Sequence, residues 1–390
     1  MQIDTLILGA GAAGMMCAAH AGGRVLVVDH AKAAGEKIRI SGGGRCNFTN
    51  MYTDPSKFLS ANPHFCKSAL ARYTQWDFIE LIDRHEIAWH EKTLGQLFCD
   101  TSAKQIVAML LTMMTEAGAD LWLQTSVENV SQDADGFNVT LSHDGKQVVV
   151  SATNLVLATG GKSIPKMGAT GLSYDIARQF GLGLTDTRPG LVPFTFADAR
   201  FAPISGVATP SKITTLDGVQ FKEALLFTHR GLSGPAVLQS SSYWHEGEAI
   251  SVDIAPETLF EQLREQRQAY GRHALKTELA RHLPARLVDH LASELALTGN
   301  LADQSDAALT VLLTKLQNWT LAPSGTEGYR TAEVTLGGID TDFVSSKTME
   351  AKDIPGLFVI GEAIDVTGWL GGYNFQWAWS SGIAAARAIA

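Results

Sequence analysis

The stretch Thr5-Leu6-Ile7-Leu8-Gly9-Ala10-Gly11-Ala12-Ala13-Gly14 decides the fold, because a short apolar run passes directly into closely spaced glycines. The apolar residues 5–8 predict a buried β-strand, and the small residues 12–21 predict the helix that follows it. A second apolar run, residues 24–29, ends in Asp29 and predicts the next strand. A strand, a helix and a strand in this order predict a parallel sheet covered by helices.

The spacing of the three glycines predicts a dinucleotide site. Gly9 permits a tight turn, Gly11 lets the backbone approach a pyrophosphate, and Gly14 lets the helix pack on the strand. The helix N-terminus then faces the phosphates. Asp29 lies 20 residues after Gly9, where it is expected to accept a hydrogen bond from a ribose hydroxyl. The strand, the helix and the acid together favour a dinucleotide site over an incidental glycine-rich turn.

The C-terminal region favours FAD over NAD as the dinucleotide. Val359-Ile360-Gly361-Glu362 places an acid directly after a predicted strand, where it is expected to meet the ribityl hydroxyls of a flavin. Gly371-Gly372-Tyr373-Asn374 begins a helix, whose amides are expected to stabilise negative charge on the reduced ring. A nicotinamide dehydrogenase does not need this second cradle. Ala158-Thr159-Gly160-Gly161 resembles the segment where flavoproteins cross back beneath the cofactor.

The rest of the chain contains further segments with strand-like and helix-like sequence patterns. Runs at 121–130, 137–142 and 147–151 predict a small sheet, and 155–158 predicts another buried parallel strand. From residue 191 short strand-like pieces broken by Pro and Gly predict an antiparallel barrel or sandwich. Residues 257–319 have a helical period, and strand texture resumes at 331–336. A length of 390 residues suits two or three domains.

Composition and charge limit the choice of partners. The net charge of −9 argues against a broad, sequence-independent grip on nucleic acid or anionic membrane, but leaves a local basic patch open. The four cysteines show neither zinc nor disulfide spacing, so no metal site is predicted and a reducing compartment is favoured. The chain opens without a basic leader, and the glycine-rich residues 6–19 are too short to span a bilayer. We therefore expect a cytoplasmic protein without a membrane partner.

Three longer motifs resemble the signature of a bacterial flavoprotein family. They are Gly35-x-Lys37-x-x-x-Ser41-Gly42-Gly43-Gly44-Arg45-Cys46-Asn47-x-Thr49-Asn50, residues 227–235 and residues 367–380. The family is that of BaiN, RdsA (also called YhiN) and the aminoacetone oxidases. The resemblance covers essentially the whole chain, and residues 64–100 and 326–336 are most similar to the RdsA branch.

The resemblance implies an α/β protein with three domains. A discontinuous, Rossmann-like FAD-binding domain is expected over residues 1–190 and 336–390. A β-barrel is expected to be inserted over residues 191–255 and 320–335, and a helical insert over residues 256–319. The composition of the chain gives the same order. The resemblance also implies FAD as cofactor and NAD(P)H as a transient electron donor.

The residues expected to bind FAD come from these motifs and their neighbours. They are Gly9, Gly11, Ala12, Ala13, Gly14, Asp29, His30, Lys37, Ser41, Gly42, Gly43, Arg45, Cys46, Asn47, Val127, Ala158, Thr159, Gly160, Gly161, Gly361, Glu362, Asp365, Gly371, Gly372, Tyr373, Asn374 and Gln376. Among them, Asn374 and Gln376 are expected to fix the flavin through amide hydrogen bonds.

Four residues are candidates for the chemistry. Tyr373 is a candidate proton donor, or else stacks or caps the helix. His229 and Arg230 are candidates for a proton donor and an anion-binding residue, or else form a turn that joins two domains. Cys46 follows Arg45, whose charge would lower the thiol pKa and favour the thiolate. A packing role for this sulfur is the favoured interpretation.

Two other groups of residues have a plain structural interpretation. Trp369, Trp377 and Trp379 lie in the C-terminal motif, where core packing is favoured over stacking on a substrate. The cations of residues 257–319 suggest an RNA-facing surface, but acids interleave with them and favour a solvated face of mixed charge.

Three functions remain open at this point. The first is an NAD(P)H-linked reductase of a conjugated C=C bond, with hydride leaving flavin N5. Resemblance to RdsA implies a uridine of large-subunit ribosomal RNA as its substrate, reduced to dihydrouridine, whereas resemblance to BaiN implies a small enone. The second is a flavin amine oxidase of the aminoacetone type. The third is a non-catalytic, flavin-bound RNA-binding factor. The sequence does not predict the oligomeric state.

Overall fold

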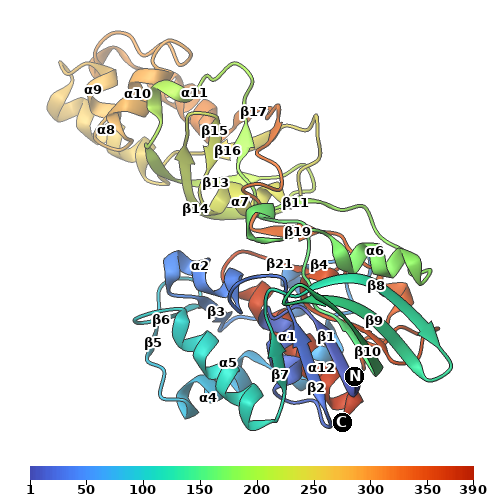
Figure 1. Cartoon of the computed structure of the whole chain (residues 1–390). Helices are drawn as coiled ribbons and strands as arrows, with labels where there is room; N and C mark the ends of the chain where they lie inside the picture. The colour runs from blue at the N-terminus through green and yellow to red at the C-terminus, as the bar shows by residue number, and fades with distance from the viewer. The chain divides into compact units, whose positions relative to one another are not determined.

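The computed structural model describes all residues, Met1–Ala390, and divides into two compact units. The first unit contains Met1–Arg188 and Val334–Ala390, so the two ends of the chain fold together (Figure 1). The second unit contains Pro189–Glu333.

A seven-stranded sheet forms the centre of the first unit. Its strands are β1 (Gln2–Leu8), β2 (Val25–Val28), β7 (Asp120–Trp122), β8 (Ser126–Asp133), β9 (Gly136–His143), β10 (Lys146–Leu157) and β20 (Leu357–Val359). Strands β7, β2, β1, β10 and β20 pair in parallel, whereas β8, β9 and β10 pair as antiparallel neighbours. Residues 5–8 are fully or almost fully buried, as expected for a central parallel strand.

Strand β10 joins two stretches that the sequence predicts as separate strands. Its first part pairs with β9 and its last part with β1 and β20. The alternating and the continuous apolar patterns therefore belong to one strand, which is half exposed near its start and buried on both faces near its end.

The first unit also contains seven α-helices. They are α1 (Ala12–Ala18), α2 (Glu36–Gly44), α3 (Lys67–Arg72), α4 (Gln75–Arg84), α5 (Lys104–Glu116), α6 (Leu172–Gln179) and α12 (Tyr373–Ile389). Helix α1 ends at Ala18, three residues before the predicted Ala21, and the chain then reaches β2 through Gly23, which has a φ of +77°. Small residues let α1 and α12 pack closely: a Cβ at Gly382 would lie 2.8 Å from the carbonyl oxygen of Ala13.

Two smaller sheets and a further short strand complete the first unit. Strands β3 (Asn47–Asn50), β6 (Gln96–Cys99) and β5 (Trp89–Glu91) form an antiparallel sheet in the order β3-β6-β5. Strand β4 (Phe58–Leu59) pairs with β21 (Thr367–Gly368). Strand β19 (Val334–Leu336) opens the C-terminal part of the unit.

The second unit contains an antiparallel sheet and a helical part. Its seven strands follow the order β17-β16-β13-β14-β15-β12-β18. Their bounds are β12 (Phe194–Thr195), β13 (Ala208–Thr214), β14 (Gln220–Phe227), β15 (Gly231–Ser233), β16 (Ile250–Asp253), β17 (Trp319–Leu321) and β18 (Gly325–Thr326). Strand β11 (Arg188–Gly190) leads into the unit, and α7 (Pro235–Ser241) packs on β13 and β14.

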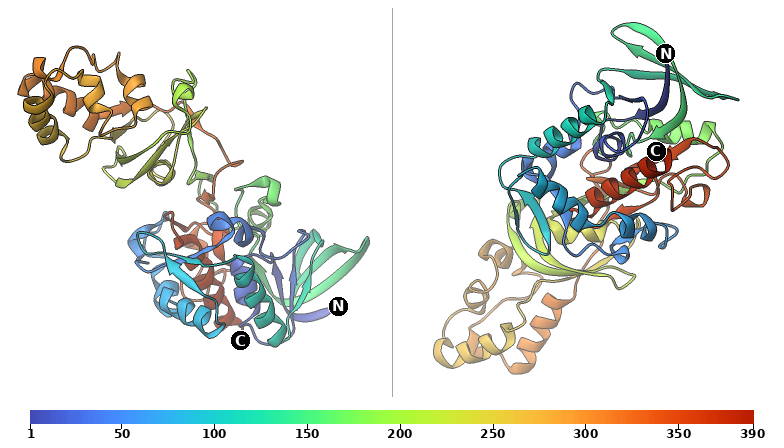
Figure 2. Two further views of the ribbon diagram at one scale, coloured as in Figure 1. Left: turned by 90° about the vertical axis from the view of Figure 1, so that its left-hand side faces the viewer. Right: turned by 90° about the horizontal axis from the view of Figure 1, so that it is seen from below.

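Four helices follow β16 in the second unit. They are α8 (Leu259–Tyr270), α9 (Leu275–Leu279), α10 (Ala285–Leu291) and α11 (Asp306–Gln317). They gather at one end of that unit, in yellow and orange in Figure 2. Their buried leucines recur at helical spacing, for example Leu309, Leu312, Leu313 and Leu316 on α11. No helix of the structure is long and apolar enough to cross a bilayer.

Candidate functional site

The glycine-rich turn after β1 has the geometry that a dinucleotide needs. Gly9 has a φ of +112°, and a Cβ there would lie 2.5 Å from the carbonyl oxygen of Ala158. A Cβ at Gly14 would lie 2.0 Å from the carbonyl oxygen of Gly9, so only glycine lets α1 pack at this point. No protein atom lies within 4 Å of a Cβ built at Gly11. The space in front of Gly11 is therefore open, at the N-terminus of α1, where phosphates bind.

Asp29 stands at the end of β2 and is held by the turn itself. Its Oδ2 accepts a hydrogen bond from the amide of Ala10 at 2.7 Å, and its Oδ1 accepts one from the amide of Ala31 at 2.8 Å. Each carboxylate oxygen has two lone pairs, so each can still accept a ribose hydroxyl. The two backbone bonds fix the carboxylate beside the open space at Gly11.

Glu362 lies just after β20 and joins three segments of the first unit. Its Oε2 accepts a hydrogen bond from the Lys37 ammonium at 2.7 Å. Its Oε1 accepts hydrogen bonds from the Ser163 hydroxyl at 2.9 Å and from the Thr335 amide at 2.9 Å. Lys37 also donates to the Ser163 hydroxyl at 2.7 Å. Both carboxylate oxygens of Glu362 therefore already accept hydrogen bonds from the protein. A ribityl hydroxyl that donates to Glu362 would have to use a remaining lone pair of one of them.

The charge of Glu362 is stabilised within this network. Burial acts to raise the pKa of Glu362, but the Lys37 charge and the hydrogen bonds to the carboxylate outweigh it. The pKa of Glu362 is held below its ordinary value, and the group is ionised at neutral pH. Ser163 and Thr335 were not predicted from the sequence, since neither stands in a motif that marks a charged partner.

The crossover segment 158–161 packs against the same network. A Cβ at Gly161 would lie 2.4 Å from the hydroxyl of Thr335 and 2.9 Å from Oε1 of Glu362. Gly160 has a φ of +73°, and its Cβ position is 3.7 Å from Oε2 of Glu362. The Thr159 hydroxyl lies 2.6 Å from that of Ser173 on α6. The two glycines let the chain pass close to the buried carboxylate.

The loop before α12 is locked by the small sheet β3-β6-β5. Gly372 has a φ of +98°, and a Cβ there would lie 2.3 Å from the carbonyl oxygen of Thr49. The side-chain amide of Asn50 donates to the carbonyl of Gly371 at 2.8 Å. A Cβ at Gly371 would lie 3.0 Å from Gln96. The N-terminus of α12 is thus held in a fixed position.

Asn374 and Gln376 both form hydrogen bonds within the polypeptide. Gln376 is fully buried; its carbonyl accepts from the Thr49 hydroxyl at 2.6 Å, and its amide donates to the carbonyl of Tyr73 at 3.1 Å. Asn374 donates to the carbonyl and accepts from the amide of Gly368, both at 2.8 Å. Both amides hold the polypeptide in place, so the prediction that they fix a flavin directly is wrong for Gln376, and Asn374 is committed to its own loop.

Residues 41–47 form an open, glycine-rich turn at the end of α2. Gly42 and Gly43 have φ values of +57° and +66°, and the Ser41 hydroxyl donates to the carbonyl of Ile38 at 2.8 Å. Nothing lies within 4 Å of a Cβ at Gly43, and the Arg45 side chain is exposed. The side-chain amide of Asn47 lies 3.3 Å from Oε1 of Gln96. Gly43 and Arg45 therefore face free space, as residues that meet a cofactor should, whereas the Ser41 hydroxyl is used within the turn.

Cys46 lies on the opposite side of this turn, inside the core. It is 0% exposed, and burial raises the pKa of its thiol well above the ordinary value. The hypothesis that Arg45 favours a thiolate is wrong, because the Arg45 side chain is exposed while the sulfur is fully buried, and burial outweighs the hydrogen bond from the Ser41 hydroxyl, which acts to lower the thiol pKa. Cys46 is a packing residue in this structure, and the same is true of Trp377 and Trp379, which are 1% and 0% exposed.

The remaining candidates are spread over both units. Tyr373 is 6% exposed, and its ring meets that of Phe58 edge-on at 6.1 Å. The Asp365 carboxylate accepts from the amide of Ala61 at 2.8 Å, and burial raises its pKa. His229 and Arg230 are exposed in the turn between β14 and β15 of the second unit.

The structure also places four other residues that the sequence predicts to bind the cofactor: Ala12, Ala13, His30 and Val127. Ala12 and Ala13 open α1, and a Cβ at Gly361 would lie 2.9 Å from that of Ala13. His30 is half exposed, and its ring fills the position of a Cβ at Gly168. Val127 is half-buried on β8 against the core.

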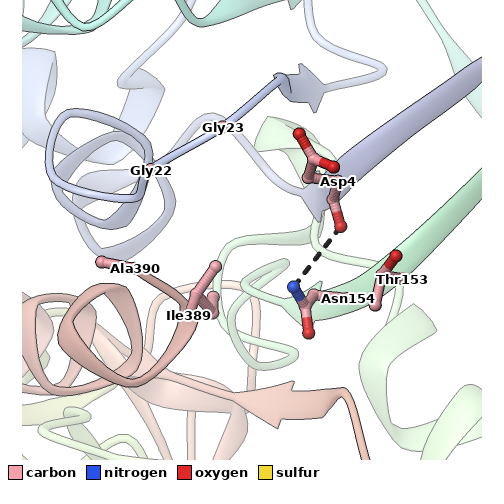
Figure 3. Close-up of a pocket in the computed structure, with 7 residues that line it drawn as sticks. All are labelled: Asp4, Gly22, Gly23, Thr153, Asn154, Ile389 and Ala390. Atoms are coloured by element: carbon pink, nitrogen blue, oxygen red, sulfur yellow. Dashed lines mark hydrogen bonds between the residues drawn. The ribbon is translucent and has the colours of Figure 1, made fainter.

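A pocket of about 310 Å³ lies at the other end of the parallel strands (Figure 3). It is lined by Asp4, Gly22, Gly23, Thr153, Asn154, Ile389 and Ala390. The only acidic side chain in it, Asp4, accepts a hydrogen bond from the amide of Arg24 at 2.6 Å. Ligands of open α/β sheets bind beyond the carboxyl ends of the strands, so this pocket is not the candidate site.

Most cations of the helical part are already paired. Arg264 and Arg267 contact Asp306, Lys276 contacts Asp289 at 2.7 Å, and Arg281 contacts the buried Glu278 at 3.3 Å. Arg286 donates to the carbonyls of Pro203 and Ser205. The arrangement confirms a face of mixed charge rather than a free basic patch.

The donor set and the shape of the first unit fit a dinucleotide. Gly11 and Gly43 leave open space, Asp29 is placed for a ribose, and the N-termini of α1 and α12 offer unpaired amides. No group of three or more His, Cys, Asp and Glu residues is placed to hold a metal ion.

Comparison with solved structures shows the same architecture. The chain matches 3-ketosteroid-delta4-(5alpha)-dehydrogenase from Rhodococcus jostii RHA1 with a TM-score of 0.53 at 16% identity, covering 99% of this chain and 97% of that one. It matches 3-ketosteroid delta1-dehydrogenase from Sterolibacterium denitrificans with a TM-score of 0.54 at 15% identity, covering 100% and 99% of the two chains. At these identities the likeness shows the fold alone: α/β, with a Rossmann domain of the FAD flavoprotein type.

Comparison with protein sequences is more specific. The chain is 54% identical to the ribosomal RNA dihydrouridine synthase of Escherichia coli K12, over 99% of this chain and 98% of that protein. It is 47% identical to the enzyme of the same name from Haemophilus influenzae, over the same shares. The 3-dehydro-bile acid delta(4,6)-reductase of Clostridium scindens is 28% identical over 98% of each chain. The family model described as HI0933-like protein Rossmann domain matches residues 3–388, and the chain therefore belongs to the family of HI0933-like proteins.

Proposed function

We propose that this protein is an FAD-dependent oxidoreductase that reduces a uridine of large-subunit ribosomal RNA to dihydrouridine, with NAD(P)H as electron donor. The observation that carries the proposal is the identity of 54% over 99% of the chain with a relative named for this reaction, together with an intact dinucleotide turn. The flavin supplies hydride transfer when bound. A ribosomal RNA substrate supports a cytoplasmic location, which we include in the proposal.

The residues of the first unit divide the work of holding FAD. Gly9, Gly11 and Gly14 form the pyrophosphate turn, and Asp29 binds the ribose of the adenosine half. Ser41, Gly43 and Arg45 line the open side of the α2 turn. The N-terminal amides of α12 lie where negative charge on the reduced ring would be stabilised.

Reduction of a C=C bond also needs a proton at the carbon that hydride does not reach. Tyr373 is our first candidate, because it begins α12 directly after the Gly371–Gly372 loop and is shielded from water. His229 is the alternative, with Arg230 as the anion-binding residue beside it; both are exposed on the second unit. We also propose that the second unit consists of a β-barrel and a helical domain, as the resemblance implies.

The test is the dihydrouridine content of large-subunit ribosomal RNA, measured by mass spectrometry in cells with and without this gene. The deletion strain is complemented by the wild type and by Gly11→Leu. Loss of dihydrouridine that only the wild type restores supports the proposal. Unchanged RNA in the deletion strain contradicts it.

A small enone is the second candidate substrate, because the Clostridium scindens relative is named for the reduction of a bile acid. Purified protein separates the candidates. Oxidation of NADPH that depends on an added enone supports this second function. Reduction of the bound flavin by an amine, with release of hydrogen peroxide, indicates an amine oxidase instead. A flavin that none of these compounds reduces, in a protein that binds RNA, indicates a non-catalytic RNA-binding factor.

A further inference from the structure

The turn between β5 and β6, together with Tyr52 after the end of β3, exposes large side chains beside the loop that precedes α12. Tyr52 and Leu94 are 61% and 55% exposed, and Lys92 is also exposed. We call these three residues the hairpin platform. The β5–β6 hairpin lies at the edge of the first unit, next to α2 (Figure 1). The platform belongs to the same unit as the dinucleotide turn.

Asn50 connects the platform to the candidate site. Its side-chain amide donates to the carbonyl of Leu94 at 3.1 Å and to the carbonyl of Gly371 at 2.8 Å. Its Oδ1 accepts from the amide of Tyr52 at 2.9 Å. One buried side chain thus fixes the turn, the tyrosine and the loop before α12 in a single arrangement.

The tyrosine ring is supported on one side and open on the other. A Cβ at Gly95 would lie 2.6 Å from Cδ2 of Tyr52, so the glycine lets the ring lie against the turn. A ring that is held in this way loses little conformational entropy when a second ring stacks on it. More than half of the tyrosine surface remains available for that contact.

Leu94 is unfavourable for the folded chain in two respects. Its φ of +52° places a branched, apolar residue in the left-handed region, and its side chain lies in solvent. A glycine would remove both disadvantages. Neither core packing nor the hairpin conformation accounts for a leucine at this position. We therefore attribute the residue to contact with a binding partner.

Lys92 gives the platform a cation that no acid neutralises. Its ammonium lies 5.5 Å from the centre of the Phe98 ring and forms no ion pair. Two acids of the same small sheet make other contacts: Glu91 accepts from the amide of Gly95 at 3.0 Å, and Asp100 contacts His90 at 2.7 Å. The cations of the helical part, in contrast, are mostly paired with acids or carbonyl groups.

We propose that the hairpin platform binds single-stranded RNA, with a base stacked on Tyr52, an apolar contact at Leu94 and a phosphate at Lys92. Exposed aromatic rings and free cations are the groups by which proteins hold unpaired nucleotides. The inference rests on the proposed function and deepens it: the nucleotides beside the target uridine would lie on the first unit, next to the loop before α12, and not on the helical part.

The experiment measures binding of a fluorescently labelled, uridine-containing single-stranded RNA of roughly 15 nucleotides by anisotropy. The variants are Tyr52→Ala, Leu94→Gly and Lys92→Ala. Their matched controls are Tyr270→Ala and Leu216→Gly, since Tyr270 and Leu216 are 47% and 73% exposed on the second unit. Flavin reduction by NADPH without RNA and the urea midpoint are measured for each protein.

We expect Tyr52→Ala and Leu94→Gly to weaken RNA binding by roughly tenfold, while the controls bind like the wild type. Lys92→Ala is expected to lower the salt slope of binding by about one. Leu94→Gly should be at least as stable as the wild type, which separates lost binding from lost folding. Flavin reduction by NADPH should be unchanged in all variants.

Two different results would overturn two different statements. If the wild type forms dihydrouridine in RNA and the platform variants bind RNA as well as it does, the platform is not the RNA surface. If the wild type neither binds RNA nor forms dihydrouridine, the proposed function itself fails. Loss of activity on a small enone in the platform variants, with RNA binding intact, would also contradict the inference.

Discussion

The ammonium of Lys37 lies 2.7 Å from the carboxylate of Glu362, although 325 positions separate the two residues in the chain. The pair joins the α2 segment to the segment after β20, and Ser163 adds the crossover segment through hydrogen bonds to both. The three segments that surround the candidate site are therefore held together by one charged network. The first predictions concern this network.

Removing Lys37 should destabilise the protein more than removing both partners. Lys37→Met leaves a largely buried carboxylate without its counter-ion, which we expect to lower the free energy of unfolding by about 2–4 kcal/mol. The double variant Lys37→Met/Glu362→Gln should recover part of this loss, because no unpaired charge remains. Urea denaturation of the single and double variants measures both effects. Equal loss in the single and double variants would show that the charge pair is not the stabilising feature.

The stability contributed by Glu362 should depend on pH. Its folded pKa lies below the ordinary value of 4.5, so the contribution is complete above pH 4.5 and is lost as the pH falls through the folded pKa. The difference in unfolding free energy between wild type and Glu362→Gln should therefore be constant near neutral pH and shrink in acid. Urea midpoints of the two proteins above and below pH 4.5 give this difference. If the difference in unfolding free energy between the two proteins grew as the pH fell, the pKa of Glu362 in the folded protein would be raised and not lowered.

Gly11 in the turn and Gly14 in α1 should respond in different ways. Gly11→Leu places a side chain in open space, so the protein should fold normally and be purified colourless. Gly14→Ala forces a Cβ to within 2.0 Å of the Gly9 carbonyl and should lower stability by about 3 kcal/mol or more. Thermal unfolding and the visible absorbance of bound flavin separate the two effects. A yellow Gly11→Leu protein with full flavin content would refute our assignment of this turn.

Cys46 should not react in the folded protein. Because burial raises the pKa of its thiol, iodoacetamide should label it only after denaturation, as followed by mass spectrometry. Arg45→Ala should leave this protection unchanged. Cys46→Ser should retain flavin reduction and turnover. Rapid labelling of the native wild type that is lost in Arg45→Ala would restore the thiolate hypothesis.

Tyr373→Phe should separate proton donation from packing. The variant keeps the ring next to Phe58 and removes the hydroxyl, so flavin content and reduction by NADPH should be unchanged. Formation of dihydrouridine should fall by roughly 10²- to 10⁴-fold, the usual contribution of a general acid. His229→Gln is the companion variant: if it alone loses this activity, the donor lies on the second unit.

Several elements could be predicted because their signals are local. The strand at 5–8, the glycine turn and the acid at the end of β2 follow from apolar runs and fixed spacing, and the structure has them in the predicted order. The exact ends of elements could not be read in this way. Ser102 and Gln105 match a capping box, but α5 begins at Lys104, and the Ser102 hydroxyl accepts only from the Lys104 amide while Gln105 bonds to Thr101.

The sequence by itself determined the dinucleotide turn, since the steric needs of Gly9, Gly11 and Gly14 and the position of Asp29 are properties of one short βαβ segment. Only the tertiary structure decided what the more distant polar groups do. Glu362 accepts hydrogen bonds from Lys37, Ser163 and Thr335. Gln376 is buried and hydrogen-bonded inside the core, and Cys46 is buried as well. The physical reason is that hydrogen-bond partners and burial depend on segments hundreds of residues apart, which no local pattern records.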